Sequence, residues 1–166
     1  MDVDLKIGDV FLCRNDGKDE SQNQSPGYFN HAAIYIGEGL IEEAQFSYGV
    51  IRVKAKNFFD RYPIIVQVRH RDEKIGEKAG EIAKKYLGNS YWKISSIFLN
   101  LRNNKRGDNC IGLVRRCYFD ASGQDYLYKI PDHVYKDTGH FKIMSKKYNE
   151  KWTVPINPFD GIVPIK

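Results

Sequence analysis

One cysteine of this chain stands where a protein can activate a thiol. Cys110 follows Asp108 and Asn109, and apolar residues recur after it at helical spacing. We therefore expect a helix over 108–121, with Asp108 as its N-cap and Cys110 in its first turn. The positive end of the helix dipole and the unpaired backbone N–H groups of a first turn favour a thiolate. The same groups can stabilise an oxyanion when a thiolate attacks a carbonyl, which makes Cys110 the candidate nucleophile.

The alternative for Cys110 is that of most free cysteines, a small buried apolar residue. That interpretation is preferred for Cys117, seven residues along the same helix, and for Cys13, within a predicted strand. Three cysteines without a C-x-x-C pair predict reduced thiols rather than a disulfide framework. The four histidines lie too far apart for a zinc motif, so neither a metal nor a cofactor is expected.

A cysteine nucleophile needs a base, and His31 is the best placed histidine. It opens a predicted strand over 31–36 directly after a polar loop, where a side chain can reach a cleft. The other three, His70, His133 and His140, lie in polar or irregular surroundings and are interpreted as structural or exposed.

Hairpin geometry nominates the group that orients this base. If G-E-G at 37–39 is a three-residue loop with its last glycine left-handed, Gln45 lies opposite His31. Glu43 is then diagonal to His31 on the same face, at roughly 7–8 Å between backbones. A two-residue loop would shift the register by one and put Glu42 in that place. Because Glu-Gly is a poor two-residue turn, Glu43 is the candidate and Glu42 the alternative.

The elements that must position these residues change from strands to helices along the chain. A helix is also expected from residue 73 to a stop at Gly88, whereas the tail beyond residue 131 is expected to be irregular with at most one short helix. An aromatic-rich helical turn is expected around residues 58–62. This order indicates an α+β fold with a mostly antiparallel sheet. The expected strands are 7–14, 31–36, 40–46, 49–53 and 64–69.

Length and composition indicate one domain over residues 1–166. At 42% hydrophobic residues the chain can bury a core, and its net charge of +5 is compatible with anionic partners without requiring one. No apolar stretch is long enough to span a bilayer, so no transmembrane segment is expected. The first residues, MDVDLKIGDVF, lack a basic region followed by an apolar one, which predicts a cytoplasmic protein.

Six short motifs in order carry a family resemblance that covers about residues 7–135. Together they resemble the circularly permuted branch of the NlpC-type papain-like cysteine hydrolases, the YiiX-like proteins, and the related lecithin:retinol acyltransferase-like proteins. In that branch a strand histidine comes first, then a polar residue, then a cysteine on a helix, as do His31, Glu43 and Cys110 here. The motifs are G-D-V-F near the start, N-H-A-A-I-Y-I-G-E-G-L-I-E-E-A at 30–44, G-V-I-R-V at 49–53, Y-L-G-N-S-Y at 86–91, N-C-I-G-L-V at 109–114 and I-P-D-H-V at 130–134.

The resemblance implies a permuted papain-like fold and a place for two further residues. Glu43 matches the position where YiiX-like members carry Glu in an E-A pair. Tyr91 matches a recurrent tyrosine that would line the substrate cleft or help to bind an oxyanion, with burial in the core as the alternative. The chain departs from the family after Cys110, where Ile111-Gly112 replaces the frequent Ser-Glu, and Asn109 before it is closer to the acyltransferase-like group.

By this resemblance the chain is expected to be a cysteine hydrolase acting on an amide, such as a small peptide or a cell-wall-type peptide. His31 would take the proton of Cys110, Glu43 would fix the imidazole, and an acyl-enzyme would form. Lipid acyl transfer or a thioester lipase route on the same triad is a second function, favoured by the Asn-Cys pair, the aromatic content and the positive charge. A non-catalytic binding module is the third, and nucleic acid is not expected because the Lys/Arg pairs lack a recognised motif.

Overall fold

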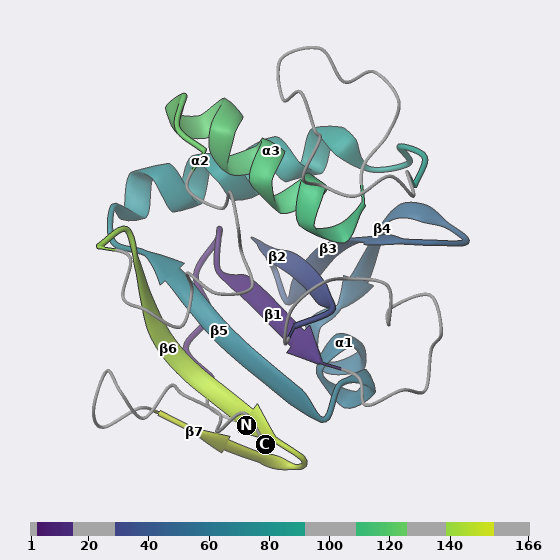
Figure 1. Ribbon diagram of the computed structural model, residues 1–166, viewed down its shortest axis with the longest axis vertical. Coiled ribbons are helices and arrows are strands. Elements are labelled where there is room, and N and C mark those ends of the chain that lie inside the picture. Colours follow the sequence, from purple (N-terminus) through teal and green to yellow (C-terminus); the bar gives the residue numbers. More distant parts are fainter. Residues whose placement is uncertain (1–2, 15–28, 92–108, 126–138, 155–166) are drawn as a thin grey trace.

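The computed structural model describes residues 3–14, 29–91, 109–125 and 139–154 (Figure 1). Seven strands form one sheet in the order β4-β3-β2-β1-β5-β6-β7, and each of its neighbouring pairs is antiparallel. The predicted α+β class with an antiparallel sheet is thereby confirmed. The strands are β1 (Val10–Arg14), β2 (His31–Gly37), β3 (Leu40–Gln45), β4 (Gly49–Lys54), β5 (Ile64–His70), β6 (Phe141–Tyr148) and β7 (Lys151–Thr153).

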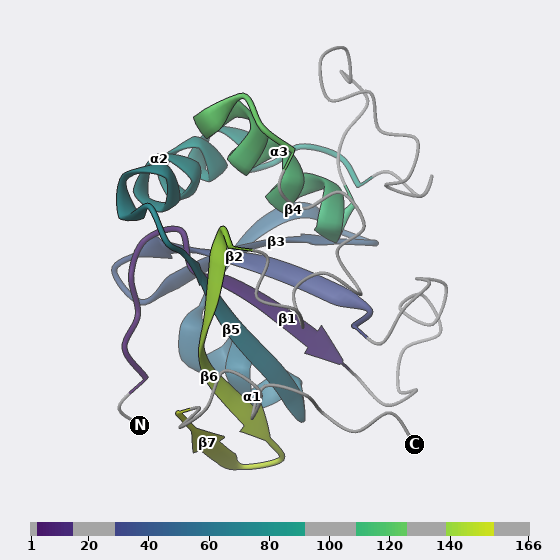
Figure 2. The ribbon, with the colours of Figure 1, turned by 60° about the vertical axis from the view of Figure 1, so that its left-hand side comes forward.

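Helices cover both faces of this sheet. Figure 2 shows α2 (Glu73–Ala83) and α3 (Cys110–Ser122) side by side on one face, and α1 (Ala55–Arg61) on the other. A 3₁₀ turn, η1 (Lys84–Tyr86), continues α2 towards Gly88, the predicted stop, which has a positive φ of 86°. Among the segments that the structure describes, no helix is long and apolar enough to cross a membrane.

The alternation of side chains along a strand gives the sheet two separate cores. On β1, Val10 and Leu12 join the large cluster under α2 and α3, whereas Phe11 and Cys13 join the aromatic cluster under α1. Each strand position in the middle of the sheet therefore belongs to one layer or the other, and a one-residue change of register would exchange the two sets.

The β2–β3 hairpin differs from its prediction at the turn but not beyond it. Gly37 pairs with Leu40, so the loop holds two residues, 38 and 39, rather than the predicted three. Both have positive φ, 54° and 71°, which is what a type I′ turn requires and what suits the twist of a hairpin. A bulge in β2 just before the turn then shifts the register, and Ala33 pairs with Glu43. The bulge restores the pairing that the three-residue loop predicted.

The predicted irregular tail is wrong, because β6 and β7 complete the sheet. Two polar side chains of β6 are buried where an apolar residue would mark a strand, and each has partners there. Ser145 donates to Gln67 Oε1 at 2.6 Å, and Lys147 Nζ donates to backbone carbonyls at the end of α1. Predictions that fall on residues 15–28, 92–108, 126–138 and 155–166 lie outside the described residues.

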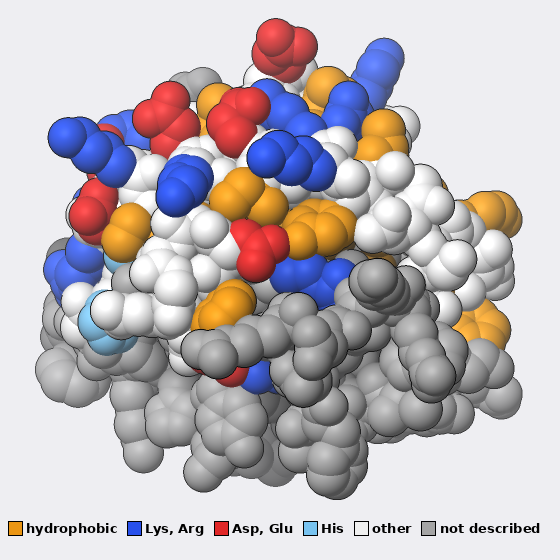
Figure 3. Space-filling model, turned by 90° about the horizontal axis from the view of Figure 1, so that it is seen from above, with side chains coloured by type: hydrophobic (Ala, Val, Ile, Leu, Met, Phe, Trp, Pro, Cys, Tyr) orange, Lys and Arg blue, Asp and Glu red, His pale blue; other side chains and the backbone are white. Residues whose placement is uncertain are grey.

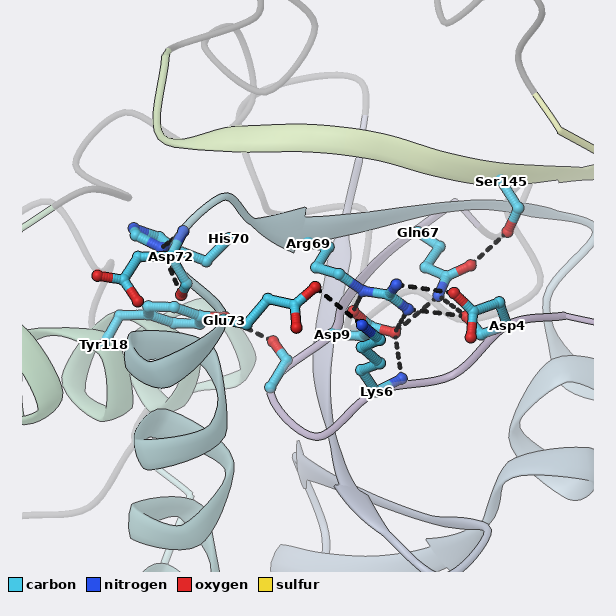
Figure 4. A network of polar contacts seen from close by, with 11 residues as sticks. Asp4, Lys6, Asp9, Gln67, Arg69, His70, Asp72, Glu73, Tyr118 and Ser145 are labelled. Carbon is cyan, nitrogen blue, oxygen red and sulfur yellow. Dashed lines mark hydrogen bonds and ion pairs between the residues drawn. The ribbon is translucent and has the colours of Figure 1, made fainter.

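A buried carboxylate near the start of β1 organises the Asp9 cluster, which consists of Asp4, Asp9, Gln67 and Arg69 (Figure 4). Asp9 is fully buried, and its carboxylate accepts two hydrogen bonds from the Arg69 guanidinium, at 2.7 and 2.8 Å. Gln67 Nε2 and the backbone N–H of Lys6 donate to the same carboxylate. The Asp4 carboxylate accepts from Arg69 Nη1, so this cluster ties the N-terminal segment to β5.

Candidate active site

His31 is the first residue of β2, and only 3% of it is exposed. Its side chain lies on the α1 face of the sheet, where Cys13 pairs with it across the β1–β2 ladder. The Tyr62 ring, just after α1, stacks on the imidazole with a centroid distance of 5.2 Å and an interplanar angle of 11°. Strand position and aromatic stacking together fix the plane of this ring.

Glu43 reaches His31 as the diagonal pairing predicts. Its Oε2 lies 2.7 Å from His31 Nε2, and Gln45 Nε2 donates to the same oxygen at 2.9 Å. A carboxylate accepts hydrogen bonds, so Nε2 carries the proton of the imidazole and Nδ1 is the nitrogen left to face a second group. Glu43 itself is fully buried.

Cys110 is the first residue of α3, and its predicted cap is corrected by one position. Asn109 rather than Asp108 is the N-cap, because the Asn109 side chain accepts a hydrogen bond from the backbone N–H of Gly112 at 2.7 Å. Asp108 lies outside the described residues. The helix continues to Ser122, one residue past its predicted end, and Gly123 closes it in the left-handed conformation.

The thiol of Cys110 and the imidazole of His31 interact directly, and each stabilises the charged form of the other. Burial raises the pKa of Cys110, but the hydrogen bond and charge of His31, together with the backbone N–H groups of Ala32 and Ile111, lower it below its usual value. Burial alone would lower the pKa of His31, yet Cys110 and Glu43 raise it to about 9. This arrangement shifts both groups towards a thiolate–imidazolium pair.

Arg61, the last residue of α1, completes the surroundings of Glu43, and nothing in the sequence singled it out. Its guanidinium donates to Glu43 Oε1, the oxygen that His31 does not use. Burial raises the pKa of Glu43, but His31 and Arg61 outweigh it and hold that pKa below its usual value. The local pattern around Arg61 carries no signal of this contact, since its partner is 18 residues away on another element.

The two remaining candidates, Glu42 and Tyr91, have other partners among the described residues. Glu42, the alternative to Glu43, is on the α2–α3 face and accepts hydrogen bonds from Arg52 Nε and Nη2. Tyr91 packs on Phe46 with a ring centroid distance of 5.6 Å and borders the large core cluster, so the structure places it in aromatic packing.

The two other cysteines are buried in the two cores, as predicted from the sequence. Cys117 joins the large cluster under α2 and α3, and Cys13 joins the aromatic cluster under α1. Burial, followed by the charge of Glu43, raises the pKa of Cys13 well above that of an ordinary thiol. The Cys13 thiol therefore differs sharply from that of Cys110 and serves as an internal standard for its reactivity.

Comparisons with known proteins bear on the fold of this chain and not on its activity. No protein-family model matches the chain, and no curated protein matches it. Among solved structures, the crystal structure of the metalloprotein yiiX from Escherichia coli O157:H7 is similar, with a TM-score of 0.53 at 18% sequence identity. The match covers 72% of this chain and 68% of that one. At this identity the similarity shows a yiiX-like fold alone.

Because yiiX is described as a metalloprotein, the donors at this site bear on whether a metal fits here. Within the ranges that the structure describes, no group of three or more His, Cys, Asp or Glu side chains could hold a metal ion. Glu43 is engaged by His31 and Arg61, which leaves Cys110 and one ring nitrogen as the donors that face each other. These residues do not fit a metal centre.

Proposed function

We propose that this protein is a cysteine hydrolase that cleaves an amide bond through a covalent acyl-enzyme on Cys110. The observation that carries the proposal is the buried interaction of Cys110 with His31, in which the environment lowers the pKa of the thiol and raises that of the imidazole. Reactive cysteines are found in such surroundings, whereas structural buried cysteines, like Cys13 here, have raised pKa values.

The chemistry follows from these positions. The Cys110 thiolate attacks the carbonyl carbon, and the imidazolium of His31 gives its Nδ1 proton to the departing amine nitrogen as the C–N bond breaks. A water molecule then attacks the thioester and gives a proton to the neutral imidazole. The C–S bond breaks, a carboxylic acid leaves, and the thiolate–imidazolium pair is restored. Glu43 holds the imidazole in the required tautomer throughout.

Backbone N–H groups at the start of α3 support the charged intermediates. The N–H of Ile111 already stabilises the thiolate, and the first turn of a helix leaves such donors unpaired. The order His31, Glu43, Cys110 supports a permuted papain-like arrangement, with the base on the sheet and the nucleophile on a helix later in the chain.

The surface that the structure describes gives less support to a nucleic-acid ligand. On the face seen in Figure 3, Lys and Arg side chains lie among Asp and Glu side chains rather than in a field of one sign. Nucleic-acid binding relies on a continuous basic footprint. Lipid acyl transfer would use the same thioester with a different acceptor, so it is an outcome of the test below.

The first experiment measures the rate of iodoacetamide labelling at each cysteine as a function of pH, read by peptide mass spectrometry. In the wild-type protein we expect Cys110 to label rapidly below pH 7, while Cys13 and Cys117 label slowly. The His31→Ala variant should lose this rapid phase. Slow labelling of Cys110 with an ordinary thiol profile, centred at a pKa of about 8.5, would overturn the proposal.

The second experiment looks for the acyl-enzyme. The protein is incubated with peptide amides and peptide esters, quenched in acid, and its intact mass is compared with that of Cys110→Ala. An adduct that appears with peptide substrates and is absent from Cys110→Ala is the expected result. An adduct formed with phospholipid esters but not with peptide substrates would overturn the amide assignment in favour of lipid acyl transfer.

A further inference from the structure

The two oxygens of the buried Glu43 carboxylate have different partners. Oε2 accepts from His31 and from Gln45, while Oε1 accepts from Arg61. A carboxylate held at one oxygen can rotate about its last side-chain bond, and here the second contact prevents that rotation. Arg61 is thus the partner that fixes which oxygen faces His31.

Arg61 is itself held from below by aromatic rings. Its guanidinium carbon lies 5.4 Å from the centroid of the Phe58 ring and 5.5 Å from that of Tyr62. Tyr62 is also the residue that stacks on His31. The arginine side chain is 39% exposed, so its charge is partly hydrated while its donor reaches the buried oxygen.

The sheet holds the end of α1 that carries these residues. Lys147 on β6 is buried, and its Nζ donates to the carbonyl oxygens of Phe59 at 2.6 Å and Tyr62 at 2.9 Å. These carbonyls belong to the last turn of α1 and the residue after it, where helix carbonyls lack intrahelical partners. The position of Tyr62 and Arg61 is therefore set by a strand on the far side of the sheet from β3.

We propose that Arg61 is a positioning residue for the hydrolase: it clamps the carboxylate of Glu43 so that Oε2 stays aligned with His31. This inference rests on the proposed function, because it assigns Arg61 a part in activating Cys110. It makes α1, on the opposite face of the sheet from the helix of the nucleophile, a functional element rather than only a cover for the core.

The neighbouring residue pair provides a matched control. Arg52 holds Glu42 as Arg61 holds Glu43: in each pair a partly exposed arginine reaches a fully buried carboxylate of β3. The two carboxylates point to opposite faces of the sheet, and Glu42 has no contact with His31 among the interactions of the described residues. Substitution of Arg52 therefore removes an equivalent ion pair without touching the site.

The effect of losing Arg61 has a definite sign. Three groups of the described residues contact the Glu43 carboxylate: His31 from β2, Gln45 from its own strand and Arg61 from α1. Cys13 on β1 is close enough for the charge of Glu43 to raise the pKa of its thiol. Without Arg61 the carboxylate becomes protonated at a higher pH, and it then no longer supports the imidazolium. The fall in Cys110 labelling on the acid side should move to higher pH by roughly half a unit to one unit.

The test measures this acid limb in four forms of the protein: wild type, Arg61→Met, Arg61→Lys and Arg52→Met. We expect the limb to shift in Arg61→Met, to return towards wild type in Arg61→Lys, which restores the charge, and to stay unchanged in Arg52→Met.

The outcomes separate this inference from the proposed function. If wild-type Cys110 labels as an ordinary thiol, both fail. If wild-type Cys110 is activated but Arg61→Met keeps its profile, only the role of Arg61 is overturned. A shift of equal size in Arg52→Met would indicate general loosening of the sheet and would also overturn it.

Discussion

Two buried carboxylates on the α1 face of the sheet, Asp9 and Glu43, have different surroundings. Asp9 lies just before β1, and Glu43 lies near the other end of that strand, where Cys13 pairs with His31. Both are fully buried and both contact an arginine. Their further partners differ: Asp9 has Gln67 and a backbone N–H, whereas Glu43 has a histidine that reaches a thiol.

The difference lies in which charges can change. Arg69 stays protonated at any pH the protein meets, and Asp9 and Asp4 raise its pKa further, so the charge of this guanidinium does not change around neutral pH. The Glu43 site includes an imidazole and a thiol whose charge states depend on each other. A closed arginine–carboxylate cluster therefore stabilises the fold, whereas the second arrangement contains the thiol and the movable proton that the proposed hydrolase requires.

The largest expected effect on stability is that of Asp9→Asn. This change leaves the buried Arg69 guanidinium without its bidentate carboxylate, which costs about 3–5 kcal/mol in the free energy of unfolding. Urea unfolding at pH 7 measures it. Asp4→Asn removes the exposed partner of the same arginine and should cost at most about 1 kcal/mol. Equal losses in the two variants would contradict the distinction drawn between them, as would an altered Cys110 labelling profile in folded Asp9→Asn.

Glu43→Gln should lower the free energy of unfolding less than Asp9→Asn does, but it should alter the His31 and Cys110 site more. His31 can release its proton when the carboxylate is lost, and Arg61 is partly hydrated, so we expect a loss of about 1–3 kcal/mol in the free energy of unfolding at pH 7. The folded-state pKa of Glu43 is lowered, so its contribution is present above the unfolded value near 4.5 and disappears as pH falls through the folded-state value. The gap to wild type should narrow accordingly in urea unfolding at low pH.

The same variant should lower the pKa of His31 from about 9, since the charge of Glu43 helps to raise it. NMR titration of the imidazole measures this pKa, with Asp9→Asn as the variant that should leave it unchanged. An unaltered His31 titration in Glu43→Gln would show that the carboxylate does not act on the base.

The site was predictable where local rules decide. The parity of side chains along β2 and β3 places Glu43 with His31, and this survived a wrong turn because the bulge compensated for the shorter loop. Polar residues before an apolar helical pattern located the start of α3 to within a residue, although the cap proved to be Asn109. These features depend on a few neighbouring residues, so their pattern is visible in the sequence.

The sequence did not reveal the contacts that join residues of distant elements. Arg61 reaches Glu43 from a helix on the α1 face, and Lys147 supports that helix from the strand β6, 85 and more positions along the chain. Buried Lys147 and Ser145 also disguised β6 as a surface segment. A buried polar residue is stable only with its partner, and a single sequence does not show which distant residue that partner is.

The smallest expected effect distinguishes two adjacent glutamates. Burial, only partly offset by Arg52, raises the pKa of Glu42, so its ionised form is less favourable in the folded chain than in the unfolded one. Among the described residues its Oε2 also has no hydrogen-bond partner. Glu42→Gln should therefore match or exceed wild-type stability at pH 7, by up to about 1 kcal/mol, and leave Cys110 labelling unchanged.

The pH dependence gives this prediction its sign. A raised folded-state pKa contributes stability that is present below the unfolded value of 4.5 and is lost as pH rises through the folded-state value. The free energy of unfolding of wild type should therefore rise relative to that of Glu42→Gln as pH falls from 7 towards 4.5. Relative to Glu43→Gln, the stability of wild type should instead fall as pH is lowered. Parallel urea titrations of both variants measure the two slopes. If the stability difference from wild type changed with pH in the same direction for both variants, the prediction would be contradicted. The face of the sheet to which each of these adjacent glutamates points would then not decide the role of its buried carboxylate.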